Sequence, residues 1–259
     1  MKVVILAGGL GTRLMEETGT RPKPMVEIGG KPIIWHIMKL YENHGFNEFI
    51  ICLGYKGHMI KEYFLNYFTY NSNLTIELKN GSVEVHSSNS ESFIITLVDT
   101  GVNTNTAGRI KRIKDFVKEE TFMLTYSDGL ADVNLTELLL FHKKSNKLAT
   151  LTTVQLPGRF GSLEFGENSI VSYFKEKPEG DGVWINGGFF VLEPGIFDYL
   201  ENEMDEVQWE KDPLVRIAQN GQLTAFKHYG FWKCMDALRD KVEFESLWAS
   251  GDAPWKTWK

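Results

Sequence analysis

The chain of 259 residues is poor in cysteine and in long hydrophobic runs, the features of disulfide-bonded secreted proteins and of membrane proteins. It contains only two cysteines, Cys52 and Cys234, and no Cys-x-x-Cys pair, which argues against a disulfide framework and a thiol redox motif. No apolar run approaches the roughly 20 residues that cross a bilayer, and the apolar stretch after Lys2 is shorter than that of a signal peptide. We therefore expect a cytoplasmic protein with no membrane partner.

The chain also lacks a basic excess. Its formal net charge is −6, whereas nucleic-acid-binding proteins gather positive charge on one face, so we expect no nucleic-acid partner. Hydrophobic residues make up 42% of the chain and charged residues 24%, which fits a globular protein with a large core. An acidic protein can still bind a polyanion where a few cations and a metal ion converge.

Short apolar runs alternate with longer helical patterns, and no internal repeat interrupts them. The runs at 3–5 and 49–53 are expected to be buried strands, and those at 94–101 and 122–126 are expected to be further strands. This alternation predicts an α/β fold with a Rossmann-like, mostly parallel sheet. We expect a single domain over residues 1–259.

A glycine-rich loop follows the first expected strand. Its residues are Leu6, Ala7, Gly8, Gly9, Leu10, Gly11, Thr12 and Arg13. Glycines let the chain bend so that its N–H groups turn toward one point, which suits phosphate oxygens. Arg13 adds a planar guanidinium, and Lys23, in an expected extended backbone between Pro22 and Pro24, adds a mobile ammonium. The pattern predicts a pocket for a highly phosphorylated small molecule.

Two common glycine motifs do not match this loop. A dinucleotide fingerprint needs a third glycine where Leu14 stands, which argues against an NAD-dependent oxidoreductase. A P-loop needs Lys and then Ser or Thr after its last glycine, but Thr12 and Arg13 follow Gly11. The phosphate pocket must therefore belong to another class of protein.

The motif Gly-Gly-x-Gly-Thr-Arg-Leu at 8–14, followed by Pro-Lys-Pro at 22–24, resembles the signature of the sugar-phosphate nucleotidyltransferases. Segments 14–18, 22–33 and 253–258 resemble one branch of that family in particular, the cytidylyltransferases that act on glucose 1-phosphate. Thymidylyl and uridylyl relatives usually carry a proline shortly after Arg-Leu, where this chain has Glu16 and Glu17. The resemblance covers essentially the whole length.

The resemblance implies a reaction, a cofactor and an assembly. The reaction would be that of CTP with α-D-glucose 1-phosphate to give CDP-glucose and pyrophosphate, with Mg²⁺, in a homo-oligomer that supplies deoxysugar and O-antigen synthesis. A nucleotide-binding part would span about 1–135, and a smaller β-rich sugar-binding part about 136–259. The same chemistry with UTP, dTTP or another sugar 1-phosphate remains an alternative, as does a relative that binds these compounds without turnover.

Catalysis is expected from Arg13 and Lys23. Arg13 would hold the departing β and γ phosphates, and Lys23 would bridge the α phosphate and the sugar phosphate, because this reaction needs position and positive charge rather than a protein nucleophile. Asp128, at the end of the run at 122–126, and Asp236 would hold the Mg²⁺. By itself, Asp236 also fits the N-cap of a following helix.

Further nucleotide contacts are expected beyond the carboxyl ends of strands, where ligands sit in open α/β sheets. The resemblance assigns them, besides the glycine loop and Lys23, to Thr104, Arg109 and Ser127. The neighbouring cations Lys111, Arg112 and Lys114 are interpreted as a solvated helix face.

The sugar contacts are expected in the second half of the chain. The resemblance assigns them to Gly161, Glu176, Lys177 and Asn186. A carboxylate and an amide can accept from and donate to sugar hydroxyls. Lys177 can meet the anomeric phosphate, and Gly161 would leave room for the hexose.

Other aromatic and histidine residues are interpreted as structural. His36 and His44 lie on an expected helix after Pro32 without an acidic partner in register. The aromatic face of the next helix is expected to pack on the sheet, and it comprises Tyr63, Phe64, Tyr67 and Phe68. The tail tryptophans are expected to cross a subunit interface or cover the sugar-binding part, and they are Trp248, Trp255 and Trp258.

Overall fold

The computed structural model describes the chain except residues 157–161, 176–182, 201–203 and 259. Seven strands form its central sheet, namely β1 (Lys2–Ala7), β4 (Glu48–Leu53), β7 (Ile94–Asp99), β8 (Phe122–Tyr126), β10 (Ala149–Val154), β13 (Ile185–Leu192) and β14 (Leu223–Lys227). Their order is β14-β10-β13-β8-β1-β4-β7. Only β13 runs antiparallel to its neighbours among these pairs, which confirms the predicted mostly parallel α/β sheet.

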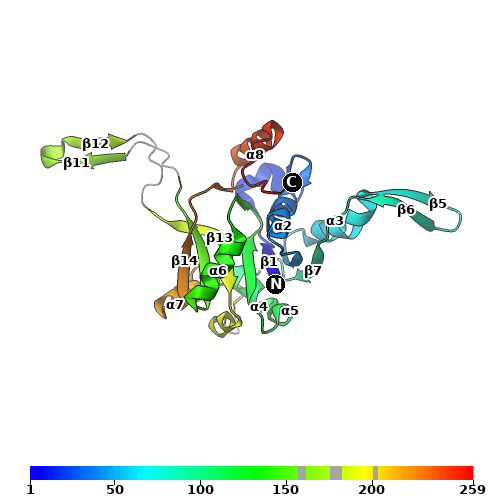
Figure 1. Cartoon of the computed structure of the whole chain (residues 1–259), viewed down its shortest axis with the longest axis horizontal. Helices are drawn as coiled ribbons and strands as arrows, with labels where there is room; N and C mark the ends of the chain where they lie inside the picture. The colour runs from blue at the N-terminus through cyan, green and yellow to red at the C-terminus, as the bar shows by residue number, and fades with distance from the viewer. Residues whose placement is uncertain (157–161, 176–182, 201–203, 259) are drawn as a thin grey trace.

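The strands are apolar because helices cover both faces of the sheet (Figure 1). Along β1, Val3, Ile5 and Ala7 face one hydrophobic core, while Val4 and Leu6 face the other, as the twofold alternation of a strand requires. Both halves of the chain contribute strands to this one sheet. The division into a nucleotide part and a sugar part stays a prediction.

The first core takes side chains from α2 (Ile33–Asn43), α3 (Gly57–Tyr70), α6 (Leu135–Ser145) and α8 (Leu238–Ser250). The second takes them from α4 (Thr106–Arg112), α5 (Lys114–Val117), η4 (Pro194–Tyr199) and α7 (Asp212–Gln219). None of the helices in the described ranges is long and apolar enough to cross a bilayer.

Two hairpins project from opposite ends of the molecule (Figure 1). One consists of β5 (Ser72–Glu77) and β6 (Ser82–Ser88), and the other of β11 (Ser162–Phe165) and β12 (Val171–Lys175). Shorter pieces complete the chain: η1 (Thr12–Leu14), α1 (Met15–Thr18), η2 (Lys23–Met25), β2 (Glu27–Ile28), β3 (Lys31–Pro32), β9 (Gly129–Ala131), η3 (Glu167–Ser169) and β15 (Trp232–Cys234).

The tryptophan-rich tail packs against its own chain. The expectation of an interface or a sugar-covering role is wrong for Trp255 and stays a prediction for the partly exposed Trp248 and Trp258. Trp248 lies edge-on to His36 with ring centroids 4.7 Å apart, and Trp258 lies 5.9 Å from Trp35. Trp255 is fully buried in the core of α2 and α8. Burial in this aromatic cluster lowers the pKa of His36 to about 4, so it is neutral at pH 7, in keeping with a structural role.

The aromatic face of α3 only partly covers the sheet. Phe64 packs against the first core, but Phe68 is 51% exposed. Tyr67 instead accepts a hydrogen bond from the indole N–H of Trp35 at 3.1 Å. The expectation that the whole face packs on the sheet is therefore wrong at Phe68, because α3 extends past the sheet toward the β5–β6 hairpin (Figure 1).

Candidate active site

The loops after β1 and β8 open onto the point where the order of the sheet reverses. Strand β1 pairs in parallel with β4 on one side and with β8 on the other, so the crevice between their carboxyl ends is the place where α/β sheets bind ligands. Two cavities of about 290 Å³ and about 1140 Å³ lie there. Arg13, Tyr126, Asp128 and Asp236 line both of them.

The smaller cavity gathers most of the residues predicted for the nucleotide. Its lining includes Leu6, Gly8, Gly9, Gly11, Thr12, Arg13, Lys23, Thr104, Arg109 and Ser127. Two predicted members of the loop lie elsewhere, because Ala7 is buried in the first core and Leu10 is 53% exposed. Contact of these residues with a nucleotide stays a prediction.

Arg109 is only 3% exposed, and its guanidinium is hydrogen-bonded to the backbone of the glycine loop. It donates to the carbonyls of Gly8 at 2.9 Å, Leu53 at 3.0 Å and Gly101 at 2.8 Å. A Cβ atom on Gly8 would come within 2.0 Å of the guanidinium, so this position has no room for a side chain. Arg109 therefore sets the shape of the phosphate loop, a role that the sequence did not indicate.

Arg112 is exposed, as expected of a solvated helix face, but its guanidinium also binds neighbouring residues. It donates to the hydroxyl of Thr104 at 2.8 Å and forms an ion pair with Asp205 at 2.7 Å. It thereby fixes the loop that follows β7. Thr104 itself is 7% exposed at the edge of the smaller cavity.

Lys23, Arg13, Asp128 and Asp236 form an ion cluster at the boundary of the two cavities. The ammonium of Lys23 lies 2.7 Å from a carboxylate oxygen of Asp128 and 3.6 Å from one of Asp236, and Arg13 pairs with Asp236. Burial opposes the charge on Lys23, but the Asp128 carboxylate and its hydrogen bond outweigh this cost, so the pKa of Lys23 lies above its ordinary value. Lys23 is therefore a permanent cation at physiological pH.

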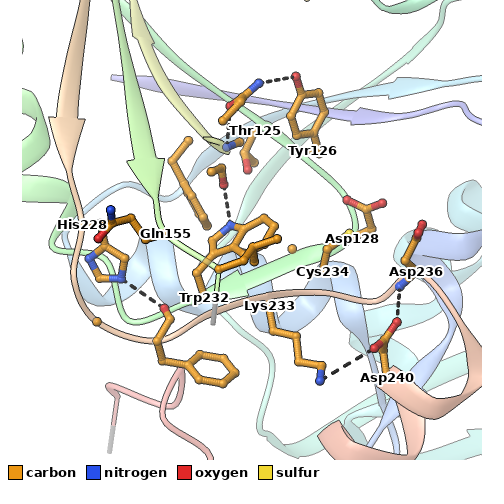
Figure 2. Close-up of a pocket in the computed structure, with 18 of the residues that line it drawn as sticks. Thr125, Tyr126, Asp128, Gln155, His228, Trp232, Lys233, Cys234, Asp236 and Asp240 are labelled. Atoms are coloured by element: carbon orange, nitrogen blue, oxygen red, sulfur yellow. Dashed lines mark hydrogen bonds and ion pairs between the residues drawn. The ribbon is translucent and has the colours of Figure 1, made fainter. Parts of the chain in front are cut away.

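The two carboxylates in this cluster suit a hard divalent cation. Asp128 and Asp236 come from the ends of β8 and β15 and lie beside each other (Figure 2). Both are within 4 Å of one ammonium, which marks the space between them as a favourable place for a cation. Within the described ranges, no group of three or more His, Cys, Asp or Glu side chains is arranged to hold a metal. Magnesium commonly uses one or two carboxylates and takes its other oxygens from substrate phosphates and water.

Two local expectations at this cluster are wrong. Asp236 is not the N-cap of the following helix, because α8 begins at Leu238 and the Asp240 carboxylate accepts from the N–H groups of Asp236 and Ala237 at 3.0 and 2.8 Å. The backbone at Lys23 is not extended, because Lys23 opens the 3-10 turn η2. In both cases, hydrogen bonds with neighbouring residues outweigh the preference of the single residue, for an N-cap at Asp236 and for extended backbone at Lys23.

The larger cavity is lined by aromatic and neutral polar side chains together with several charged ones, among them Lys233 and Asp240. Asn186 is one of its lining residues, and its contact with a sugar stays a prediction. Gln155, His228 and Trp232 line the same cavity (Figure 2). The indole N–H of Trp232 donates to the carbonyl of Gly187 at 2.7 Å. The other residues predicted for the sugar lie outside the described residues, namely Gly161, Glu176 and Lys177.

Tyr126 and Glu210 are residues of this region that the sequence did not bring to notice. Tyr126 lines both cavities and donates its hydroxyl proton to Glu210. The position of Tyr126, directly before Ser127 and Asp128 at a strand end, was a usable signal. Glu210 offered none, because it lies 84 residues away and belongs to no motif.

A family model described as nucleotidyl transferase matches residues 2–236. The chain is a member of this family. The match includes the glycine loop, Lys23, Asp128 and Asp236, the residues that the structure brings together at the crevice.

Other members of the nucleotidyl transferase family are similar over the whole chain. Proteins of Salmonella typhimurium and Salmonella typhi named glucose-1-phosphate cytidylyltransferase are each 55% identical over 260 residues, covering 100% of both chains. Among solved structures, HddC of Yersinia pseudotuberculosis aligns with a TM-score of 0.68 at 23% identity, over 95% of this chain and 99% of that one. That likeness supports the shared fold.

Proposed function

We propose that the chain transfers a cytidylyl group from CTP to α-D-glucose 1-phosphate, giving CDP-glucose and pyrophosphate. The observation that carries the proposal is the full-length, 55% identity with the Salmonella proteins of that name. The convergence of Arg13, Lys23, Asp128 and Asp236 on one cavity supports it. The two cations can bind phosphate oxygens, and the two carboxylates can bind a divalent metal ion.

The reaction would proceed by in-line displacement without a protein nucleophile. A phosphate oxygen of glucose 1-phosphate attacks the α phosphorus of CTP, the bond to the bridging oxygen of the β phosphate breaks, and its electron pair leaves with pyrophosphate. Lys23 would lie between the two anions and reduce their repulsion. Arg13, whose side chain is largely exposed, would exchange its ion pair with Asp236 for contacts to the β and γ phosphates.

We propose Mg²⁺ as the metal, with Asp128 and Asp236 as its protein ligands. When bound, the ion would supply positive charge to the phosphates. The two carboxylates would hold it at the boundary of the cavities, and Lys23 would exchange its ion pairs with them for contacts to phosphate oxygens. Ser127 and Thr104 would offer hydroxyl groups to the nucleotide.

The hexose would occupy the larger cavity, where Asn186 offers both a donor and an acceptor. We further propose that Gly161, Glu176 and Lys177 complete this side of the site. The aromatic rings and amide groups in its lining suit the ring and the hydroxyl groups of a sugar.

Association with further copies of the chain is part of the proposal. The β11–β12 hairpin projects from the body and carries apolar side chains that would otherwise remain in water (Figure 1). They are Leu163, Phe165, Ile170, Val171, Tyr173 and Phe174, between 47% and 67% exposed. Such exposed apolar surface is typical of protein interfaces.

The decisive experiment is pyrophosphate release with Mg²⁺ and glucose 1-phosphate, run separately with CTP, UTP, dTTP, ATP and GTP. Release with CTP alone supports the proposal. Release with another nucleotide would retain the chemistry and replace the substrate. If no pyrophosphate is released with any of the five nucleotides, or with other sugar 1-phosphates, the result would support a relative that binds these compounds without turnover.

A further inference from the structure

A continuous chain of hydrogen bonds runs between the two cavities. The hydroxyl of Thr106, at the first residue of α4, lies 2.9 Å from one carboxylate oxygen of Glu210, and the phenol of Tyr126 contacts the other oxygen. The phenol oxygen lies 3.3 Å from the amide nitrogen of Asn186. Thr106 lines the smaller cavity, Asn186 the larger one, and Tyr126 both.

The direction of every hydrogen bond in this chain is determined. The backbone N–H of Gly188 can only donate, so the atom of Asn186 that lies 2.8 Å from it is the amide oxygen. The amide nitrogen of Asn186 therefore donates to the phenol oxygen of Tyr126. The phenol proton must then go to Glu210, whose carboxylate can only accept.

Packing leaves this chain little freedom to rearrange. Gly188 has a φ of +81°, and a Cβ atom there would come within 2.7 Å of the Tyr126 ring. At the other end, Thr106 accepts from the N–H of Trp209 at 2.7 Å, which holds Glu210 beside it.

The residues just before Glu210 are hydrogen-bonded to the start of α4 and to the loop that precedes it. The N–H of Asn105 donates to the carbonyl of Asp205 at 2.6 Å, and the N–H of Ala107 donates to that of Val207 at 3.1 Å. Glu210 therefore sits at a fixed distance from the loop before α4. Its carboxylate joins that loop to the last residue of β8.

We propose that Glu210 and Tyr126 are positioning residues that orient Asn186 toward the hydroxyl groups of the sugar substrate. The proposal rests on the proposed function. With one N–H of the amide committed to Tyr126 and one lone pair to Gly188, Asn186 retains one N–H and one lone pair for the larger cavity. An amide held in one orientation discriminates between hydroxyl patterns better than one that can flip.

The test compares Tyr126→Phe, Glu210→Ala and Glu210→Gln in the full chain. Tyr126→Phe and Glu210→Ala should raise the KM for glucose 1-phosphate about tenfold, while the KM for CTP changes less than about twofold. Glu210→Gln should stay within about twofold of wild type, because its amide oxygen can still accept from Tyr126. The matched control is Glu206→Ala, an exposed residue of the same segment whose main-chain carbonyl makes the contact with Asn105.

Equilibrium binding of CDP-glucose and of CTP, with thermal unfolding of each variant, separates the outcomes. Weaker binding of CDP-glucose alone supports the proposal. An unchanged KM and affinity for the sugar compounds with a lower Tm would overturn it and assign the chain a purely structural role. Equal losses with Glu210→Gln and Glu210→Ala would also overturn it. Suppose that the wild-type protein releases pyrophosphate from CTP with another sugar 1-phosphate but not with glucose 1-phosphate, and fails to bind CDP-glucose. That result would overturn both this inference and the assigned sugar.

Discussion

The two cavities that meet at Tyr126 differ in the kind of interaction that builds them. In the smaller cavity, Lys23 and Arg13 face the carboxylates of Asp128 and Asp236. In the larger cavity, Gln155, Asn186 and Trp232 form a neutral side, with Trp232 bonded to the carbonyl of Gly187. The charged side chains of Lys233, Asp240 and Glu243 also line this cavity, and they pair with one another. The ionic side suits charge that moves during a reaction, and the neutral side suits the shape and hydroxyl pattern of a substrate.

The comparison teaches that charge and orientation are controlled by different parts of the chain. The ion cluster draws on residues 13, 23, 128 and 236, which the fold gathers at one boundary. On the neutral side, Asn186 is held by a chain of hydrogen bonds through Tyr126, and Trp232 by its bond to the carbonyl of Gly187. Substitutions on the ionic side should therefore reduce turnover, whereas those on the neutral side should weaken sugar binding.

The largest effect should come from Lys23→Ala. Removing the cation that would lie between two phosphates should lower kcat about 10³-fold, because this interaction is strongest in the transition state. Pyrophosphate release measures the loss, and circular dichroism should remain that of the wild type. Lys144→Ala, an exposed lysine on α6, serves as the control. Activity of Lys23→Ala close to wild type would remove Lys23 from the mechanism.

Asp128→Asn should lower kcat/KM roughly 100-fold and raise the magnesium concentration needed for half-maximal rate. The reason is the loss of one of two carboxylate ligands. Chelation of the metal in wild type should stop turnover, and added magnesium should restore it. Binding of Mn²⁺ followed by magnetic resonance gives a readout that is independent of activity. Equal metal affinity in the variant and wild type would contradict the assignment.

Arg109→Met should separate loop shape from direct nucleotide contact. It removes donors from several buried carbonyls, which should lower the free energy of unfolding by about 2–4 kcal/mol. Urea unfolding measures this loss, and the KM for CTP should rise with it because the glycine loop is no longer held. A stability equal to that of wild type with a raised KM for CTP would mean that Arg109 acts only on the nucleotide.

Trp232→Phe should act on the neutral side alone. It keeps an aromatic ring but loses the indole N–H that bonds Gly187, so the KM for glucose 1-phosphate should rise about threefold with little change in kcat. Steady-state kinetics with each substrate varied in turn provides the measurement. A fall in kcat larger than the rise in KM would show that the two sides are not separable.

The smallest effect should be the pH response of Lys23 in the free protein. Its pKa is raised in the folded state, so its ion pairs contribute stability fully below the unfolded pKa near 10.4 and lose it only as pH rises through the folded value. Unfolding of wild type and Lys23→Met between pH 7 and 10 should therefore differ by a constant amount. A difference that shrinks between pH 7 and 9 would mean that Lys23 titrates lower and that the ionic side is weaker than described.

Much of the fold and part of the candidate site could be predicted from local patterns. The runs of β1, β4 and β8 are buried on both faces, so apolar composition alone identifies them, whereas β7 is a half-exposed strand at the edge of the sheet. The glycine loop and Lys23 lie in one short stretch, and their spacing carries the phosphate chemistry. Expectations failed where a distant contact competed with a local preference. Ala237 stands at the N-cap of α8 in place of Asp236, with the Asp240 carboxylate accepting from its N–H, and the tail tryptophans pack around His36 within the same chain.

The sequence by itself determined the alternating strands and helices, the glycine loop, and the charged residues available for catalysis, because periodicity and composition act over a few neighbouring residues. Only the tertiary structure decided what those charges touch. Arg109 turned inward to hold the loop, and Glu210 met Tyr126 across 84 residues. Burial is the physical reason, since a polar group taken out of water must find its partners wherever the packed elements bring them.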